Sequence, residues 1–179
     1  MKLLVISDIH GSCYYAKKIE QIYAQEKPDS MILLGDLYYQ GMQSVLSEEY
    51  NPLQVSCILN KYKENILCAK GNCDSKFDEE VSAFSFHDKI EMKIMGKNFV
   101  FTHGHKYNLD HPIEEIDVLV YGHFHTHFIK KKENTLYINV GSISFPRNGT
   151  HHSYAVIDDD TIFLKDVDGE IIEKINIIG

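Results

Sequence analysis

The stretch KLLVISDIH, residues 2–10, decides the fold, because its apolar run leads directly to two polar side chains, Asp8 and His10. Apolar runs of this length, bounded by polar residues or glycine, are typical of buried strands. Four later runs end in the same way, at residues 31–34 before Asp36, 66–69 before Asn72, 98–101 before His103, and 118–121 before His123 and His125. In open α/β sheets, ligands bind at the carboxyl ends of the strands. We therefore expect these seven side chains to meet at one rim.

The segments between the first three runs predict helices. Ser12 is a suitable N-cap for a helix that reaches about residue 25, and Pro28 closes that segment. Asn51 and Pro52 mark the start of a second helix. A strand–helix–strand–helix–strand order implies right-handed crossovers and a parallel sheet.

The second half of the sequence is rich in predicted strands. Residues 84–95 and 97–102 flank Gly96 and indicate a hairpin. Further strands are expected around residues 117–121, 127–132, 135–140, 154–157, 161–167 and 171–177. This pattern predicts two sheets packed face to face with helices outside. Because no linker or repeat interrupts it, we expect residues 1–179 to form a single domain.

Composition narrows the classes of function. The formal net charge is −8 and apolar residues make up 44% of the chain. Proteins that bind nucleic acids or membrane surfaces need a basic face, and the negative net charge does not favour one. Asp8 and His10 interrupt the first apolar run too early for a signal peptide, so a cytoplasmic protein is expected. The four cysteines show no CxxC pair or disulfide framework.

The side chains expected at the rim have the chemistry of metal ligands. Two carboxylates, four imidazoles and one amide suffice for two divalent cations, so the sequence predicts a metal-dependent hydrolase. In each Asp-x-His or His-x-His pair, an extended backbone would place both ligands on one face, since side chains alternate with period two. A single such pair is weak evidence. The specific signal is the ordered series of five, each following an apolar run.

This series resembles the motifs of calcineurin-like metallophosphoesterases. The motifs are Asp8-x-His10, Gly35-Asp36, Gly71-Asn72, His103-Gly104-His105 and Gly122-His123-x-His125. The length and the variant Gly71-Asn72-Cys73-Asp74 resemble the small YfcE-type phosphodiesterases of bacteria and archaea. The likeness extends to Asn139-Val140-Gly141-Ser142 and Pro146. It implies a four-layer α/β/β/α sandwich of two mixed sheets flanked by helices.

The resemblance also implies a division of ligands between two metal ions. One ion would take Asp8, His10, Asp36 and His125, and the other would take Asp36, Asn72, His103 and His123, with Asp36 bridging. Mixed nitrogen and oxygen ligands suit Mn²⁺, Fe²⁺ or Zn²⁺ more than Ca²⁺ or Mg²⁺. Mn²⁺ is the metal that the family suggests, with Zn²⁺, Fe²⁺ and Ni²⁺ as alternatives. A metal-bound hydroxide would then attack the phosphorus of a small phosphodiester.

The sequence departs from the wider superfamily at Cys73, where many members carry a histidine that acts as general acid. A thiol suits that role less well than imidazole, and His105 is an alternative, as is the absence of any protein acid. Packing behind Asn72 is an equally good interpretation of Cys73. Asp74 is expected either to orient a ligand histidine or to cap the turn.

Aromatic residues and one long irregular segment are candidates for substrate selection. Tyr38, Tyr39 and Phe77 follow ligand positions and could stack on a nucleobase or aryl group, with loop packing as the alternative. The segment 38–50 is the longest irregular stretch near the expected site.

Three other functions compete with phosphodiester hydrolysis. A phosphomonoesterase or nucleotidase would want more cationic residues around the phosphate than Lys70, Lys76, Lys106 and Arg147. A nuclease is disfavoured by the acidic charge. A non-catalytic interaction scaffold, like the retromer subunit of similar fold, would not need a complete set of ligands. Self-association, which is common in the family, is left open by the sequence.

Overall fold

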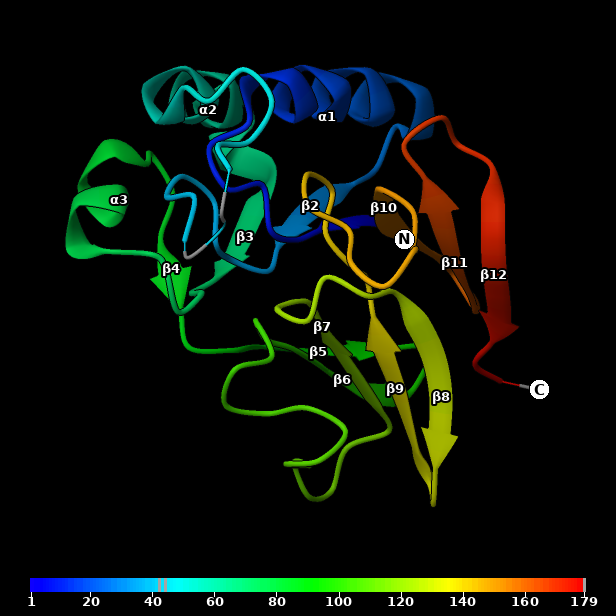
Figure 1. Cartoon of the computed structure of the whole chain (residues 1–179). Coiled ribbons are helices and arrows are strands. Elements are labelled where there is room, and N and C mark those ends of the chain that lie inside the picture. The colour runs from blue at the N-terminus through cyan, green and yellow to red at the C-terminus, as the bar shows by residue number, and fades with distance from the viewer. Residues whose placement is uncertain (42, 44, 179) are drawn as a thin grey trace.

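The computed structural model describes residues 1–41, 43 and 45–178, which form two β-sheets, three α-helices and one short 3-10 helix. In chain order the elements are β1 (Lys2–Ile6), α1 (Cys13–Glu26), β2 (Ser30–Leu33), α2 (Pro52–Asn60), η1 (Lys63–Asn65), β3 (Ile66–Ala69), α3 (Lys76–Val81), β4 (Phe86–His87), β5 (Ile90–Ile94), β6 (Lys97–Phe101), β7 (Val118–Tyr121), β8 (Phe128–Lys132), β9 (Thr135–Asn139), β10 (Ser153–Asp158), β11 (Thr161–Asp166) and β12 (Ile171–Asn176). The fold is α/β with two mixed sheets, as predicted (Figure 1).

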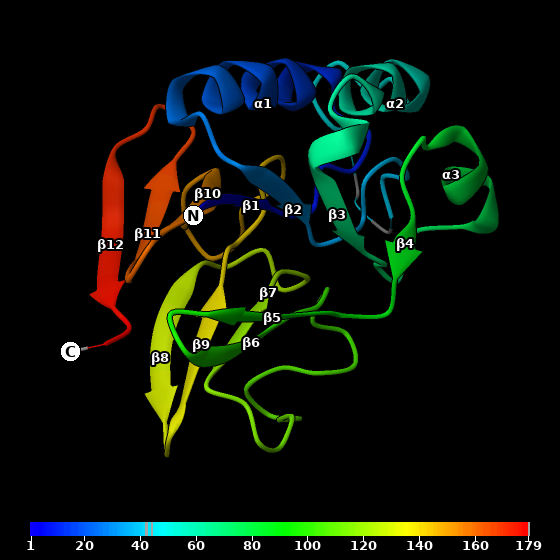
Figure 2. The same cartoon turned by 180° about the vertical axis from the view of Figure 1, so that it is seen from behind.

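The first sheet has the strand order β12-β11-β10-β1-β2-β3-β4. Strands β1, β2 and β3 pair in parallel, which confirms the crossovers expected from the first half of the sequence. Helix α1 begins where the Ser12 side chain accepts a hydrogen bond from the backbone of Tyr15, and α2 begins after Asn51 with Pro52 in its first turn. Both helices lie over the outer face of this sheet (Figure 2).

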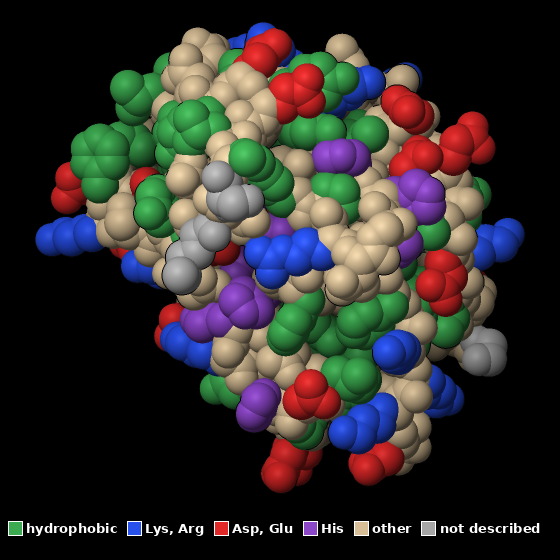
Figure 3. All heavy atoms as spheres, viewed as in Figure 1, with side chains coloured by type: hydrophobic (Ala, Val, Ile, Leu, Met, Phe, Trp, Pro, Cys, Tyr) green, Lys and Arg blue, Asp and Glu red, His purple; other side chains and the backbone are tan. Residues whose placement is uncertain are grey.

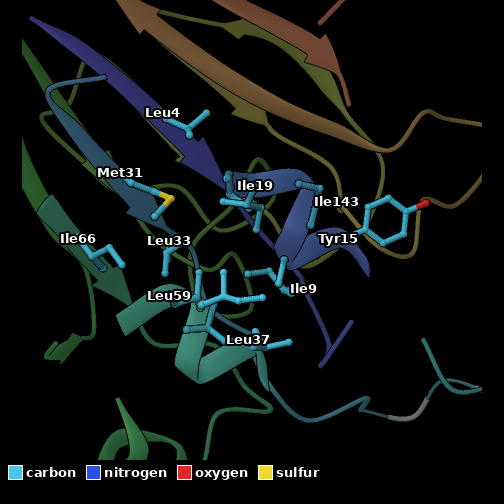
Figure 4. Close-up of a cluster of buried hydrophobic side chains, with 14 of the residues drawn as sticks. Leu4, Ile9, Tyr15, Ile19, Met31, Leu33, Leu37, Leu59, Ile66 and Ile143 are labelled. Carbon is cyan, nitrogen blue, oxygen red and sulfur yellow. The ribbon is translucent and has the colours of Figure 1, made fainter. Parts of the chain in front are cut away.

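Two apolar clusters bury the faces of the first sheet. Side chains such as Leu4, Met31 and Leu33 meet Ile19 of α1 and Leu59 of α2 on the outer face (Figure 4). The opposite face packs against the second sheet, whose strand order is β5-β6-β7-β9-β8. Apolar residues therefore alternate between the two clusters along β1, as the period of a strand requires.

The predicted hairpin at residues 84–102 is only partly correct. Residues 90–94 and 97–101 do form the antiparallel pair β5–β6. However, β4 pairs in parallel with β3 in the first sheet, and the chain crosses to the second sheet at Asp88 and Lys89. The reason is that Phe84 and Phe86 pack on the helix side of the first sheet, whereas Ile90 and Ile94 belong to the cluster between the sheets.

The outer face of the second sheet is covered by the irregular segment 102–117 rather than by a helix, within the described residues. The Asn108 side chain accepts hydrogen bonds from the backbone N–H groups of Asp110 and His111, and Pro112 follows. These contacts favour turns over a helix. Apolar side chains of the segment, Leu109, Ile113 and Ile116, pack on the sheet.

Helix α3 was not predicted, although it has a sequence signal. Ser75 and Asp78 form a capping box, in which each side chain bonds the backbone N–H of the other residue. None of the helices in the described part of the chain is long and apolar enough to cross a membrane.

Candidate metal centre

The strands β1, β2, β3, β6 and β7 end at a common rim that both sheets contribute to (Figure 1). The residues that follow them bring together the seven side chains predicted as ligands. Histidine side chains gather near the middle of the face shown in Figure 3. Below the surface, Asp8 and His103 are completely buried and His10, Asp36 and His125 nearly so.

From the Asp-x-His pattern we expected an extended backbone at this rim. The structure shows that it is not extended. Five of the seven residues have a left-handed φ, namely Asp8 (57°), His10 (48°), Asp36 (54°), His123 (67°) and His125 (59°). Left-handed conformations of non-glycine residues cost about 1–2 kcal/mol each and are concentrated at functional sites. In each Asp-x-His or His-x-His pair, the two side chains therefore converge because the chain turns sharply after the strand. The alternation of side chains along an extended strand is not the cause.

Three histidines are held in one tautomer by backbone carbonyl groups. The Nδ1–H of His10 donates to Tyr39 O (2.8 Å), that of His103 to Leu34 O (2.7 Å), and that of His125 to Phe145 O (2.7 Å). In each neutral ring the Nε2 lone pair then points toward the rim.

These Nε2 atoms lie close to other hydrogen-bond acceptors, which have no proton to donate. His10 Nε2 lies 3.2 Å from His125 Nε2. Asp8 Oδ1 is buried without a hydrogen bond among the described residues, although His125 Nε2 lies 3.2 Å away. Converging lone pairs and an unsatisfied carboxylate oxygen are costly unless a cation or protons bind between them. The donor set therefore fits a divalent cation.

A second group of the predicted ligands lies beside the first, with Asp36 close to both groups. His103 Nε2 is 3.4 Å from Asp36 Oδ2 and 2.9 Å from Asn72 Oδ1. His123 Nδ1 lies 3.2 Å from His103 Nε2. Asp36 Oδ2 also lies 3.8 Å from His10 Nε2, so this carboxylate stands between the two groups. Among the described residues, three clusters are suitable for a metal ion. Asp8 with His10 and His125 and Asp8 with Asp36 and His103 are buried, and His10 with Asp36 and Cys73 is buried except for the half-buried cysteine.

The carboxylates and imidazoles shift each other's pKa values. Burial opposes the charged form of Asp8, but the contacts with His10 and His125 outweigh it and hold the pKa of Asp8 well below its usual range. Burial likewise opposes the charged form of His103, but contact with Asp36 and the charge of Asp8 raise the pKa of His103 to about 9. The carboxylates and the imidazoles beside them thus stabilise each other's charged forms.

The residues considered as general acids are poorly suited to that role. Burial and then the charge of Asp36 raise the pKa of Cys73 to about 12. Burial and the nearby charges of His103 and His123 lower the pKa of His105 to about 4, and His105 Nδ1 is buried without a partner among the described residues.

Asp74 caps the turn, which was one of its two predicted roles. Its carboxylate accepts hydrogen bonds from the backbone N–H groups of Asp36 (2.8 Å), Leu37 (2.9 Å) and Gly71 (2.7 Å). Within the described part of the chain it forms no hydrogen bond with a predicted ligand histidine, so it positions the loops that carry Asp36 and Asn72.

Several residues that support the site were not assigned a role from sequence. Ser7 Oγ donates to Asp8 Oδ2 (2.5 Å), and the hydroxyl groups of Ser142 and Ser144 both donate to Asp8 O (2.8 Å each). Ser142 belongs to the motif at residues 139–142 that carried the family resemblance. That motif was therefore a signal that these residues hold the end of β1 in its left-handed turn.

The centre opens into a cavity of about 230 Å³. Besides five of the predicted ligands and Cys73, its walls include Gln43 and Arg147, which are hydrogen-bonded to each other (3.3 Å). Arg147 is the sole arginine of the sequence, and it places a planar cationic group at the mouth of this cavity.

Comparison with known proteins identifies the family. Residues 1–161 match the model of the calcineurin-like phosphoesterase superfamily domain. The chain belongs to this superfamily. It is 32% identical to the phosphodiesterase YfcE of Escherichia coli over 165 residues, which cover 90% of each chain. The structure of the E. coli YfcE phosphoesterase superposes with a TM-score of 0.95 at 30% identity and covers 99% of this chain and 100% of that one.

More distant similarities show how widely the fold is used. The phosphodiesterase MJ0936 of Methanocaldococcus jannaschii is 26% identical over 79% of this chain and 83% of its own. Vps29 of Entamoeba histolytica, in its zinc complex, has a TM-score of 0.64 at 19% identity, over 99% of both chains. This second likeness concerns the fold alone. As a superfamily member with buried His and Asp clusters, the chain has the features of a metal-binding phosphoesterase of the YfcE type.

Proposed function

We propose that this protein is a metal-dependent phosphodiesterase that hydrolyses small phosphodiesters. The observation that carries the proposal is the convergence of two buried carboxylates with four imidazoles and one amide, in which Asp8 Oδ1 lacks a hydrogen bond among the described residues. YfcE and MJ0936, both named phosphodiesterases, support the class of reaction.

The seven rim residues would hold two divalent cations. Following the family pattern, one would be held by Asp8, His10, Asp36 and His125, and the other by Asp36, Asn72, His103 and His123. Such ions supply positive charge to a phosphate and make water a better nucleophile near neutral pH. Mixed nitrogen and oxygen donors suit Mn²⁺, Fe²⁺ or Zn²⁺ more than Ca²⁺ or Mg²⁺. The resemblance to the family suggests Mn²⁺, with Zn²⁺, Fe²⁺ and Ni²⁺ as alternatives.

The protein's own groups would orient the reactants. The backbone carbonyl groups of Tyr39, Leu34 and Phe145 fix the imidazole rings, so the site needs little rearrangement when a substrate binds. Arg147 at the cavity mouth would contact a phosphate oxygen.

The charge around the cavity supports diesters over monoesters. A monoester dianion calls for several cationic groups near the phosphate. Of the candidate residues, Lys70 is paired with Glu79 and Lys106 with Asp88 (3.2 Å). Arg147 lines the cavity itself, which matches the single charge of a diester better than the double charge of a monoester.

The test is hydrolysis of bis(p-nitrophenyl) phosphate and p-nitrophenyl phosphate by chelator-treated protein, before and after Mn²⁺ or Zn²⁺ is restored. We expect restored activity that favours the diester. Asn72→Ala should lower kcat/KM at least a hundredfold, while Asn134→Ala, in the exposed turn between β8 and β9, should not. Absence of activity with every metal in folded protein would contradict the proposal, and preference for the monoester would replace it with a phosphomonoesterase.

A further inference from the structure

A second cavity, of about 500 Å³, lies beside the metal centre. Its walls include Tyr39, Tyr50, Pro52 and Phe77, and Cys73 lines both this cavity and the one at the metal centre. A volume of this size is typical of small-molecule sites. Apolar side chains also gather over α2 and α3, on the face where the histidines lie (Figure 3).

Two of these wall residues are hydrogen-bonded to predicted ligands, and a third packs on the residue next to one. The carbonyl of Tyr39 accepts the hydrogen bond from His10 Nδ1 (2.8 Å), and the backbone N–H of Cys73 donates to Asp36 Oδ1 (2.8 Å). Tyr50 packs on Gly11, directly after His10, where a Cβ would come within 2.5 Å of the Tyr50 ring. The walls of the second cavity are thus positioned by the same residues that form the metal centre.

The walls offer ring faces more than hydrogen-bonding groups. Tyr39 is 54% exposed and Phe77 is 62% exposed, so the rings of both side chains are accessible to a ligand. Ser75 and Asp78, which also line the cavity, are already engaged in the capping box of α3. Tyr38 is buried and its hydroxyl is hydrogen-bonded to Ser82 (2.6 Å), so it packs within the loop instead of facing a ligand.

We propose that this cavity binds a planar aromatic arm of the substrate, a nucleobase or an aryl group, by stacking on Tyr39 and Phe77 while the phosphodiester lies at the metal centre. This inference rests on the proposed function and names the class of substrate for it. Stacking is tolerant of sequence because every base has a ring face. We therefore expect selection for an aromatic arm with little discrimination among bases.

The first test keeps the leaving group constant. In methyl, cyclohexyl, phenyl and thymidine 5′-esters of p-nitrophenyl phosphate, water adds to phosphorus and p-nitrophenolate leaves, so the second ester alone differs. For the metal-loaded protein, kcat/KM should be at least about fivefold higher for the phenyl and thymidine esters than for the methyl ester, with the cyclohexyl ester well below phenyl. If the protein favours the phenyl ester but not the thymidine ester, the cavity is an aryl site. If it favours both esters, the cavity is a general site for aromatic groups.

Substitutions in the cavity wall test whether the preference for aromatic esters arises there. Phe77→Leu and Tyr39→Leu, which keep an apolar side chain but remove the ring, should reduce the ratio of phenyl to methyl kcat/KM toward one. Tyr107→Leu, an exposed aromatic residue that does not line either cavity, is the matched control and should preserve the ratio. Equal rates for cyclohexyl and phenyl esters, or unchanged ratios in Phe77→Leu and Tyr39→Leu, would overturn the proposal.

Binding measurements separate this inference from the proposed reaction. Phenethylphosphonate and ethylphosphonate have a carbon–phosphorus bond that hydrolysis does not break, so calorimetry reports binding whether or not the protein is a phosphodiesterase. We expect the aromatic phosphonate to bind at least about fivefold more tightly, and Phe77→Leu to remove the difference. Diester hydrolysis without any aromatic preference would leave the proposed function standing and refute this inference. A Phe77-dependent dimer in sedimentation, with no aromatic preference, would assign the cavity to a second copy instead.

Discussion

Cys73 shows how the environment of one residue changes its chemistry. Its backbone N–H is bound to Asp36, and its side chain lies between the two cavities. Burial and the charge of Asp36 raise the pKa of the thiol to about 12, so it stays protonated at neutral pH and donates a proton poorly. His105, with a pKa of about 4, is neutral at pH 7 and has no proton to spare as an imidazolium.

We predict that neither residue acts as the general acid. Cys73→Ala and His105→Ala should each change kcat for bis(p-nitrophenyl) phosphate by less than about tenfold, far less than Asn72→Ala. The dependence of rate on leaving-group pKa, measured with a series of substituted aryl esters, should be steep in the wild type and equally steep in both variants. A variant that selectively loses activity on esters of poor leaving groups would show that its residue is the acid after all.

The metal centre depends on elements of both sheets meeting closely. Asp8, Asp36 and Asn72 follow strands of the first sheet, whereas His103 and His123 follow strands of the second. After β7, a Cβ at Gly122 would lie 1.9 Å from Ser7 Oγ and 2.5 Å from Asp8 Oδ2. Contact at this distance excludes any side chain, so glycine is required where the two sheets join.

A partly buried ion-pair network ties α1 to the first sheet at its other end. Glu26, the last residue of α1, lies 2.6 Å from Lys165 Nζ and 3.0 Å from Lys2 Nζ, and it accepts a hydrogen bond from the Tyr154 hydroxyl (3.1 Å). Burial opposes the charged form of Glu26, but the bonds from Lys165 and Lys2 outweigh it and lower its pKa from the ordinary value of 4.5.

This network predicts a pH-dependent stability. Because the folded-state pKa of Glu26 is depressed, its contribution is fully present above pH 4.5 and is lost as the pH falls through the folded-state value. Glu26→Gln should lower the free energy of unfolding by about 1–3 kcal/mol at pH 7 and by progressively less below pH 4.5. Urea unfolding across this range measures the difference. Glu64→Gln, whose side chain is 85% exposed, is the control and should change little at any pH. A constant difference across the range would contradict the network's role.

At the scale of the whole molecule, the ligands come from five separate places between residues 8 and 125, and the cluster between the sheets joins them into one structure. Asp8 and Asp36 bring two negative charges into a buried centre. A cation that binds between them only in the folded chain should therefore stabilise the folded state.

We expect Mn²⁺ or Zn²⁺, added to chelator-treated protein, to raise Tm by about 5–10 °C at a hundredfold excess over Kd. Near- and far-ultraviolet circular dichroism should follow one coincident transition, because residues 1–179 are expected to unfold as a single domain. Asp36→Asn should abolish most of the increase, whereas Asp88→Asn, whose side chain is 80% exposed, should retain it. Separate transitions would refute the single domain, and an equal increase in both variants would refute the assigned metal site.

The order of strands and helices in the first half, the pairing of β5 with β6, and the set of side chains at the rim were all predictable from sequence. Hydrophobic period, caps and turn residues are local signals, and the polar residues directly after five apolar runs are visible without a structure. The capping box of α3 is equally local, so Ser75 and Asp78 made this helix predictable as well.

Only the tertiary structure decided how those side chains converge and what surrounds them. The left-handed turns at Asp8, His10, Asp36, His123 and His125 replace the extended pairs that sequence spacing suggested, because contacts from distant residues such as Ser142 and Ser144 hold a strained backbone that local propensity disfavours. In the same way, the switch of β4 and β5 between sheets and the aromatic cavity beside Cys73 depend on packing between segments far apart in the chain. A sequence specifies which chemical groups are available, whereas long-range packing determines the geometry in which they act.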